Sequence, residues 1–170
     1  MRALKIFLPF IAGMFLAGCA GYHLGPVNGV EAGAKTVEVQ PFNNQTLQPR
    51  FGDDMTQALR EKFQSDGTYR LTTSSPGDMV VSGVIRDYQR EGLGYLNADA
   101  STPQNFRVGV VVHVTVRDRA TGKVILDRDV KGHTLINIGS DLVSSERQAG
   151  PTLAADVAQN IVTLLAEGAW

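Results

Sequence analysis

The stretch that decides the fold is residues 106–116, FRVGVVVHVTV. Every second residue is apolar from Phe106 to Val116, while Arg107 and the alternate residues that follow it are mostly polar or small. Successive side chains of a β-strand point to opposite faces, so this alternation predicts a strand that covers a core on one side only. A one-sided strand in turn needs helices to cover its apolar face.

The residues after this strand predict a hairpin. Ala120-Thr121-Gly122 places a glycine where a three-residue loop needs a left-handed backbone, and a second strand is expected from Val124 to about Leu135. If Arg119 pairs with Lys123, the polar face sets Thr115 opposite Asp127, His113 opposite Asp129 and Val111 opposite Lys131. His113 is then expected on a half-exposed sheet face beside Asp129.

The residues before this strand predict a strand, a helix and two more strands. Lys35–Phe42 alternates, and Phe51, Met55, Leu59 and Phe63 recur every four residues before Gly67. A brief strand is expected over 69–73, and a longer one from Met79 to about Arg90. Because the alternation breaks over residues 92–105, that segment is predicted to be a glycine-bearing loop.

The C-terminal part predicts one more helix. Residues 136–150 are expected to form a loop, and Pro151 is placed at the first helical position, where its missing N–H costs nothing. Gly168 ends the apolar pattern. The predicted fold class is therefore α+β: a two-layer sandwich with two helices on one face of a mixed or antiparallel sheet of four to five strands. One domain spans residues 35–170.

Composition limits the function classes. The chain has 170 residues with 16 Lys+Arg and 17 Asp+Glu, a formal net charge of -1. This near balance does not supply the cationic surface that phosphate neutralisation requires, so nucleic acid is excluded as a partner.

Residues 1–18 are typical of a cleaved secretory signal peptide, with Arg2 and Lys5 before an uncharged run. That run is too short to span a bilayer. The sequence LAGC over residues 16–19 resembles the lipobox of bacterial lipoproteins, which implies acylation of Cys19 and membrane anchoring through a tether over 19–34. Ala20, where an inner-membrane retention signal would have Asp, implies the periplasmic face of the outer membrane. The alternative is a soluble secreted protein with a free thiol.

No constellation of catalytic or metal-binding residues is evident. His23, His113 and His133 lack a second ligand at metal spacing, and neither glycine-bearing loop matches a phosphate-binding motif. With its only cysteine used for the anchor, the chain also lacks a thiol nucleophile. We therefore expect no enzyme activity, no metal and no cofactor; a periplasmic hydrolase would need a nucleophile and base that the sequence does not provide.

The order of these features resembles the lipopolysaccharide-assembly lipoproteins of the LptE type. The resemblance rests on the lipobox running into Cys19–Leu24, on residues 35–44 (KTVEVQPFNN) before a helix, on Val108–Lys123 and on the closing helix. It implies a non-enzymatic subunit of the lipopolysaccharide translocon that plugs a large outer-membrane β-barrel of the LptD type and binds lipopolysaccharide. An alternative with the same anchor and fold is a lipoprotein that regulates a cell-wall synthase or supports a secretion channel.

Lipopolysaccharide carries phosphates, so cations on the polar sheet face, together with the loop over 92–105, are the candidate contacts. The candidate lipopolysaccharide-binding residues are Arg86, Arg90, Arg107, Arg117 and Lys131. Against this, a strand arginine taken singly is more commonly a solvated side chain.

Overall fold

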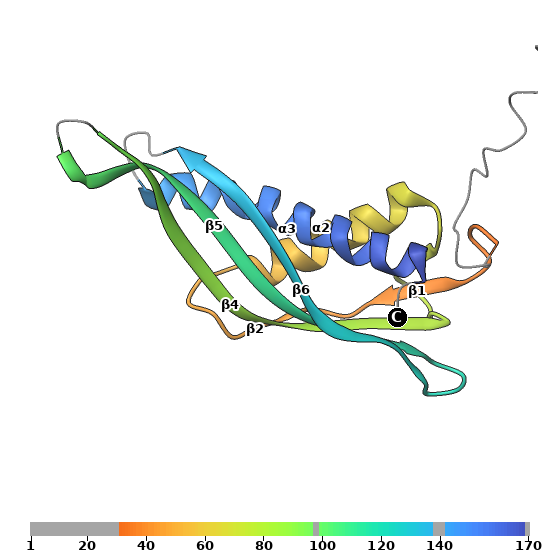
Figure 1. Ribbon diagram of the computed structural model, residues 1–170. Coiled ribbons are helices and arrows are strands. Elements are labelled where there is room, and N and C mark those ends of the chain that lie inside the picture. Colours follow the sequence, from red (N-terminus) through yellow and green to blue (C-terminus); the bar gives the residue numbers. More distant parts are fainter. Residues whose placement is uncertain (1–30, 97–98, 138–141, 169–170) are drawn as a thin grey trace, which may run out of the picture.

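The computed structural model describes residues 31–96, 99–137 and 142–168 of the chain. Its elements are β1 (Thr36–Val39), β2 (Asn43–Asn44), α2 (Phe51–Asp66), β3 (Arg70–Thr72), β4 (Met79–Leu96), β5 (Asp99–Asp118), β6 (Val124–Asn137) and α3 (Leu142–Glu167) (Figure 1). The signal peptide and most of the tether expected before Lys35 lie outside the described residues.

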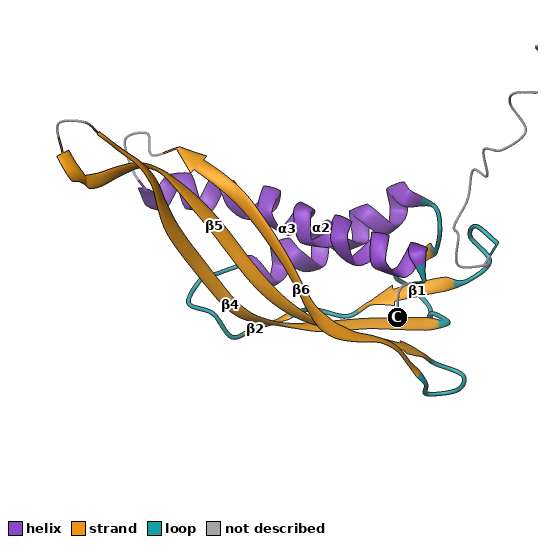
Figure 2. Ribbon diagram, viewed as in Figure 1, coloured by secondary structure: helices purple, strands orange, loops and turns teal. Residues whose placement is uncertain are grey.

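The sheet has six strands, one more than the highest number expected, in the order β3-β1-β4-β5-β6, with β2 also paired to β4. β1 runs parallel to β3 and β4, whereas β4, β5 and β6 are successively antiparallel. Both helices lie on one face of this mixed sheet (Figure 2). The predicted α+β two-layer sandwich is therefore confirmed.

The core lies between the sheet and the helices. Val108, Val110, Val112, Val114 and Val116 of β5 are at most 2% exposed, as the alternation predicted. Opposite them, one apolar stripe of each helix is buried: Met55, Leu59 and Phe63 of α2, and Leu153, Val157, Ile161 and Leu165 of α3. Burial of these stripes leaves the other face of the sheet to solvent.

The predicted hairpin register is confirmed along the body of β5 and β6, where His113 pairs with Asp129 and Val111 with Lys131. The predicted pairing of Arg119 with Lys123 is wrong, because a register shift follows Val116. The N–H of Arg119 instead donates to the Asp78 carbonyl at 2.8 Å. Gly122 adopts the expected left-handed backbone at φ 68°.

The loop predicted over residues 92–105 is wrong. β4 continues to Leu96 and β5 begins at Asp99, with Gly92 paired to Phe106 and Leu93 to Asn105. Side-chain alternation is lost here, but antiparallel pairing satisfies backbone groups whatever the side chains are. The result is a long hairpin that extends past the helices at the end of the domain opposite β1 (Figure 1).

The loop predicted over residues 136–150 is also wrong. β6 includes Ile136 and Asn137, and α3 begins at Leu142, so that Pro151 lies inside the helix. An internal proline removes one hydrogen bond to the preceding turn. Leu142 and Ala149 nevertheless pack against the core, and this burial keeps the first turns helical. The predicted end is confirmed, since Gly168 follows Glu167 with φ 67°.

A β-bulge in β4 decides which side chains face the helices. The register shifts between Ile85 and Asp87, with Arg86 as the extra residue. Before the bulge the odd-numbered residues Val81 and Ile85 are buried. After it the even-numbered residue Tyr88 pairs with Val110 on the helix-covered face. A one-residue insertion exchanges the two faces of a strand, and it does so here.

Candidate functional site

The five cations named as lipopolysaccharide contacts do not form one patch. Arg107, Arg117 and Lys131 follow the open-face alternation of β5 and β6. Arg90 lies beyond the bulge and pairs with buried Val108, so it faces α3 instead. Arg90 therefore does not share the open face with the other candidate cations, and the reason is the bulge at Arg86.

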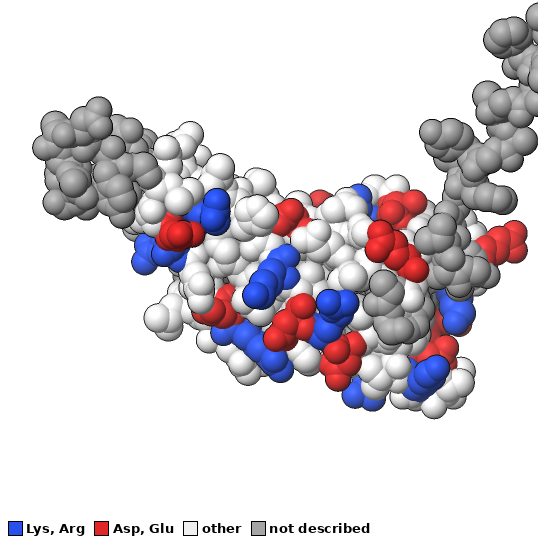
Figure 3. Space-filling view, viewed as in Figure 1, with Lys and Arg blue, Asp and Glu red and all other residues white. Residues whose placement is uncertain are grey.

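Three of these cations are paired with acids. The closest ion-pair atoms are 3.1 Å apart for Arg86–Asp129, 3.1 Å for Arg90–Glu146 and 3.5 Å for Arg107–Glu91. Within the described ranges, no ion pair involves Arg117 or Lys131, and both side chains are exposed. Cationic and anionic side chains are interspersed on the face that Figure 3 shows. Arg117 and Lys131 are thus the two candidates whose charge is not already compensated by a neighbour.

His113 lies at the centre of a polar cluster on the open face. Its Nδ1 is 2.8 Å from Asp129 Oδ1 and its Nε2 is 2.9 Å from Asp127 Oδ1. Thr115 donates to Asp127 at 3.2 Å, and Arg86 donates to Asp129 at 3.1 Å. The predicted half-exposed position of His113 beside Asp129 is confirmed. The cluster joins β4, β5 and β6 across the open face, which favours a rigid surface there.

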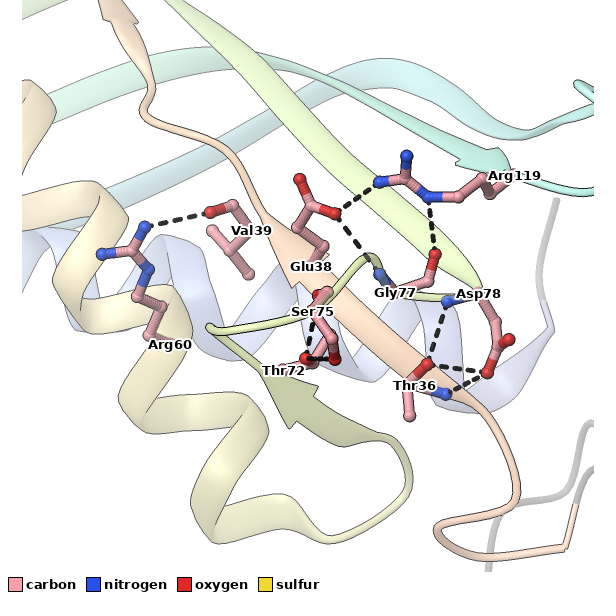
Figure 4. A network of polar contacts seen from close by, with 9 residues as sticks. All are labelled: Thr36, Glu38, Val39, Arg60, Thr72, Ser75, Gly77, Asp78 and Arg119. Carbon is pink, nitrogen blue, oxygen red and sulfur yellow. Dashed lines mark hydrogen bonds and ion pairs between the residues drawn. The ribbon is translucent and has the colours of Figure 1, made fainter.

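A second network of polar contacts lies beside the β5–β6 turn. We call it the hairpin latch; it comprises Thr36, Glu38, Gly77, Asp78 and Arg119 (Figure 4). Arg119 donates to the Gly77 carbonyl at 2.8 Å and also contacts the Glu38 carboxylate. The backbone N–H and hydroxyl of Thr36 donate to Asp78 Oδ2 at 2.8 and 2.7 Å. These two hydrogen bonds, ahead of any nearby charge, lower the pKa of Asp78. The latch ties the β5–β6 turn to β1, directly after the segment that leads from Cys19.

A cleft of about 540 Å³ lies between the first turns of α2 and α3. We call it the helix-end cleft. It is lined by Tyr88 of β4, by Arg50, Asp53 and Asp54 at the start of α2, and by Val143, Glu146 and Arg147 of α3. Tyr88 reaches it because of the bulge, and its ring meets Phe51 edge-on with centroids 6.2 Å apart. Three separate segments of the chain therefore build one concave surface.

Burial raises the pKa of two groups that line the helix-end cleft, Tyr88 and Asp54. Desolvation, together with the nearby Glu146 carboxylate, raises the pKa of Tyr88 to about 12, against the opposing effect of Arg90. Desolvation and the adjacent Asp53 carboxylate raise the pKa of Asp54, against the effect of Arg50. Tyr88, like a tyrosine with the ordinary pKa, keeps its proton at neutral pH, and its hydroxyl can both donate and accept a hydrogen bond.

Sequence reasoning missed the helix-end cleft, although one pattern marks part of it. The apolar positions of β4 change from odd to even numbers between Ile85 and Tyr88, which is the trace that a bulge leaves in a sequence. The contribution of α3 could not be found, because residues 142–150 were expected to be a loop. Cys19 lies outside the described residues, and its acylation remains a prediction.

Two kinds of feature are absent from the described residues. No helix there is both long and apolar enough to cross a membrane. No group of three or more His, Cys, Asp and Glu side chains in that same part of the chain is placed to hold a metal ion.

Comparison with known proteins identifies related sequences and folds. The family model described as LptE, lipopolysaccharide-assembly, matches residues 34–165. No curated protein matches the chain. Among solved structures, a protein of Xanthomonas campestris superposes with a TM-score of 0.58 at 11% identity, covering 85% of this chain and 91% of that one.

Two lipoproteins are also similar in structure. A minor lipoprotein of Acinetobacter baumannii has a TM-score of 0.52 at 15% identity, covering 78% of this chain and 92% of that one. Lipoprotein B of Nitrosomonas europaea has a TM-score of 0.51 at 11% identity, covering 86% of this chain and 90% of that one. At these identities the likeness establishes the fold alone.

Proposed function

Because the chain belongs to the LptE lipopolysaccharide-assembly family, we propose that it is the lipoprotein subunit of an outer-membrane lipopolysaccharide translocon. In this role it plugs a large β-barrel partner of the LptD type and binds lipopolysaccharide for insertion into the outer leaflet. The observation that carries the proposal is the family match over residues 34–165, which spans every strand, α2, and all but the last two residues of α3. The role is one of assembly and requires no catalysis by the chain.

The proposed anchor is a diacylated or triacylated Cys19, exposed after cleavage of residues 1–18, with residues 19–34 as the tether and 35–170 as the single domain. Each buried methylene of an acyl chain contributes about 0.8 kcal/mol, so two or three chains hold a protein at a membrane where one does not. The similar folds of lipoproteins from Acinetobacter baumannii and Nitrosomonas europaea are consistent with an anchored domain in the cell envelope. We place it on the periplasmic face of the outer membrane.

The surface of the domain suits a polar barrel lumen. A plug has to present polar groups to the lumen wall without an excess of either charge. Ion pairs such as Arg86–Asp129 and Arg107–Glu91 lie on the open sheet face, and Figure 3 shows both charges interspersed. The His113 cluster stiffens the same face. These features support, for this domain, a rigid and electrically balanced plug.

The first test is the identity of the partner. The lipidated, tagged chain is purified from detergent-solubilised outer membrane, and proteins recovered in stoichiometric amount are identified by mass spectrometry. A large β-barrel protein is the expected result. Recovery of a cell-wall synthase or a secretion-channel component instead would refute the translocon role and favour a regulatory lipoprotein with the same anchor.

The second test concerns lipopolysaccharide contact by the two cations without ion-pair partners. Reversal of both charges in Arg117→Glu/Lys131→Glu should weaken lipopolysaccharide binding by about tenfold or more, because phosphate contacts to charged donors are strong. Arg128→Glu is the matched control, since Arg128 is exposed on the same strand as Lys131 but pairs with buried Val114 on the helix side of the sheet. Equal binding by the folded double variant and the wild type would exclude these two residues as contacts.

A further inference from the structure

We propose that the helix-end cleft binds a sugar residue through hydrogen bonds from Tyr88, Arg50 and Arg147 and to the carboxylates beside them. The identification of lipopolysaccharide as the source of that sugar rests on the proposed function. The class of ligand rests on the size, the charge balance and the hydrogen-bonding groups of the cleft itself.

The helix-end cleft has the size and construction of a small-ligand site. Its volume of about 540 Å³ lies within the range of roughly 300–1,000 Å³ found for ligand pockets. Two of its walls are the first turns of α2 and α3, and the third is Tyr88 on the central part of the sheet. Because helices and a strand carry all of the named groups except Arg50, which directly precedes α2, their geometry is held more firmly than it would be on loops.

The charges of the cleft argue against the two simplest ligands. The lining carries the guanidinium groups of Arg50 and Arg147 and the carboxylates of Asp53, Asp54 and Glu146, of which Glu146 also pairs with Arg90. Three carboxylates against two guanidinium groups leave the lining with an excess of negative charge, which disfavours a phosphate or other polyanion. An acyl chain would leave these charged groups without partners, at a large desolvation cost. A neutral ligand that offers both donors and acceptors avoids both penalties.

The remaining wall groups match the two surfaces of a sugar ring. Guanidinium groups only donate and carboxylates only accept, so together they can bind several hydroxyl groups of one ligand. The hydroxyl of Tyr88 adds a group that can do both. The ring of Tyr88 and the side chain of Val143, which is 60% exposed, supply apolar surface for the C–H groups of the sugar.

The test measures binding of a neutral hexose oligosaccharide, free of phosphate and acidic sugars, to the full lipidated chain in detergent micelles by calorimetry. Arg147→Gln should weaken binding by about tenfold, the usual effect of losing one hydrogen bond from a charged donor. Tyr88→Phe, which keeps the ring and removes the hydroxyl, should weaken it by about threefold to tenfold. Arg128→Gln removes an exposed arginine that does not line the cleft and should bind as the wild type does. Circular dichroism verifies that each variant is folded.

Three outcomes would overturn the proposal: no saturable binding of the oligosaccharide, binding that Arg147→Gln and Tyr88→Phe leave unchanged, or displacement of the oligosaccharide by inorganic phosphate. If the oligosaccharide does not bind but the barrel co-purifies and intact lipopolysaccharide binds, the sugar site is refuted and the translocon role stands. If the oligosaccharide binds in the cleft, but the barrel does not co-purify and intact lipopolysaccharide does not bind, the sugar site stands and the translocon role is refuted.

Discussion

The contact between α3 and β6 predicts that replacing a glycine by alanine lowers the stability of the domain on β6 but does not lower it on the adjacent strand β5. Gly132 of β6 is buried directly beneath α3. A Cβ added at Gly132 would lie 2.5 Å from Val157 Cγ2, 3.0 Å from Asp156 Oδ2 and 3.2 Å from Val157 N. The last of these atoms belongs to the helix backbone, so rotation of a side chain alone does not relieve the crowding.

Gly132→Ala should therefore push α3 away from the sheet. The shift would strain the hydrogen bond from the His133 N–H to Asp156 Oδ2, which is 2.9 Å long. Overpacking of a well-packed core costs about 1–3 kcal/mol. For a chain of this size each kcal/mol corresponds to about 2–4 °C, so we expect the Tm to fall by about 2–12 °C.

Gly109→Ala is the matched control on β5. A Cβ at Gly109 would meet the Gly132 carbonyl oxygen at 3.7 Å, an ordinary contact. Because alanine restricts the unfolded chain more than glycine does, this variant should be neutral or more stable by about 0.4–1 kcal/mol. Urea unfolding of the lipidated chain in detergent, followed by far-ultraviolet circular dichroism, compares the two. Equal transition midpoints for Gly132→Ala and Gly109→Ala would refute the close-approach argument.

Three other variants test the polar contacts. Thr36→Val removes a hydroxyl donor that lowers the pKa of Asp78 below 3.8. The stability contributed by this carboxylate is present above that pH and lost as pH falls through the lowered pKa, so the difference in Tm from the wild type should narrow on acidification. The part of the difference that comes from the lost hydrogen bond of the Asp78 N–H to the Thr36 hydroxyl, 2.9 Å long, does not depend on pH. Arg90→Ala leaves Glu146, whose side chain is 10% exposed, without its cation and should cost about 1–3 kcal/mol in urea unfolding. Tyr88→Phe should remove from the ultraviolet pH titration the phenolate component with a pKa of about 12.

Each of these has a result that would contradict it. Arg107→Ala is the control for Arg90→Ala, because the Arg107–Glu91 pair has side chains 51% and 65% exposed and should contribute at most about 1 kcal/mol. Equal losses from the two arginine variants would refute the buried character of the Arg90 pair. A difference in Tm between wild type and Thr36→Val that stays constant with pH would rule out the Asp78 linkage. If Tyr88→Phe instead removes from the ultraviolet titration a component near the ordinary tyrosine pKa, the burial of Tyr88 is refuted.

The candidate site was only partly predictable from the sequence. The polar face of β5 and the pairs His113–Asp129 and Val111–Lys131 follow from alternation and turn chemistry, which are local properties. That Arg90 lies on the helix side of the sheet could not be foreseen, because the extra residue Arg86 shifts the alternation of β4. The sequence also did not reveal that acids compensate three of the five candidate cations, because two of these ion pairs join residues distant along the chain.

The sequence by itself determined the elements whose side-chain period is strong: the β5–β6 hairpin, the apolar stripes of α2 and α3, and hence two helices on one face of a sheet. Tertiary structure alone decided the rest. Pairing between β4 and β5 makes strands of residues 92–96 and 99–105, where the period is lost, and packing of Leu142 and Ala149 carries α3 through Pro151. The helix-end cleft exists only because the bulge turns Tyr88 toward those added helical turns. Local preference decides an element when the pattern is strong, and long-range contacts decide it when the pattern is weak.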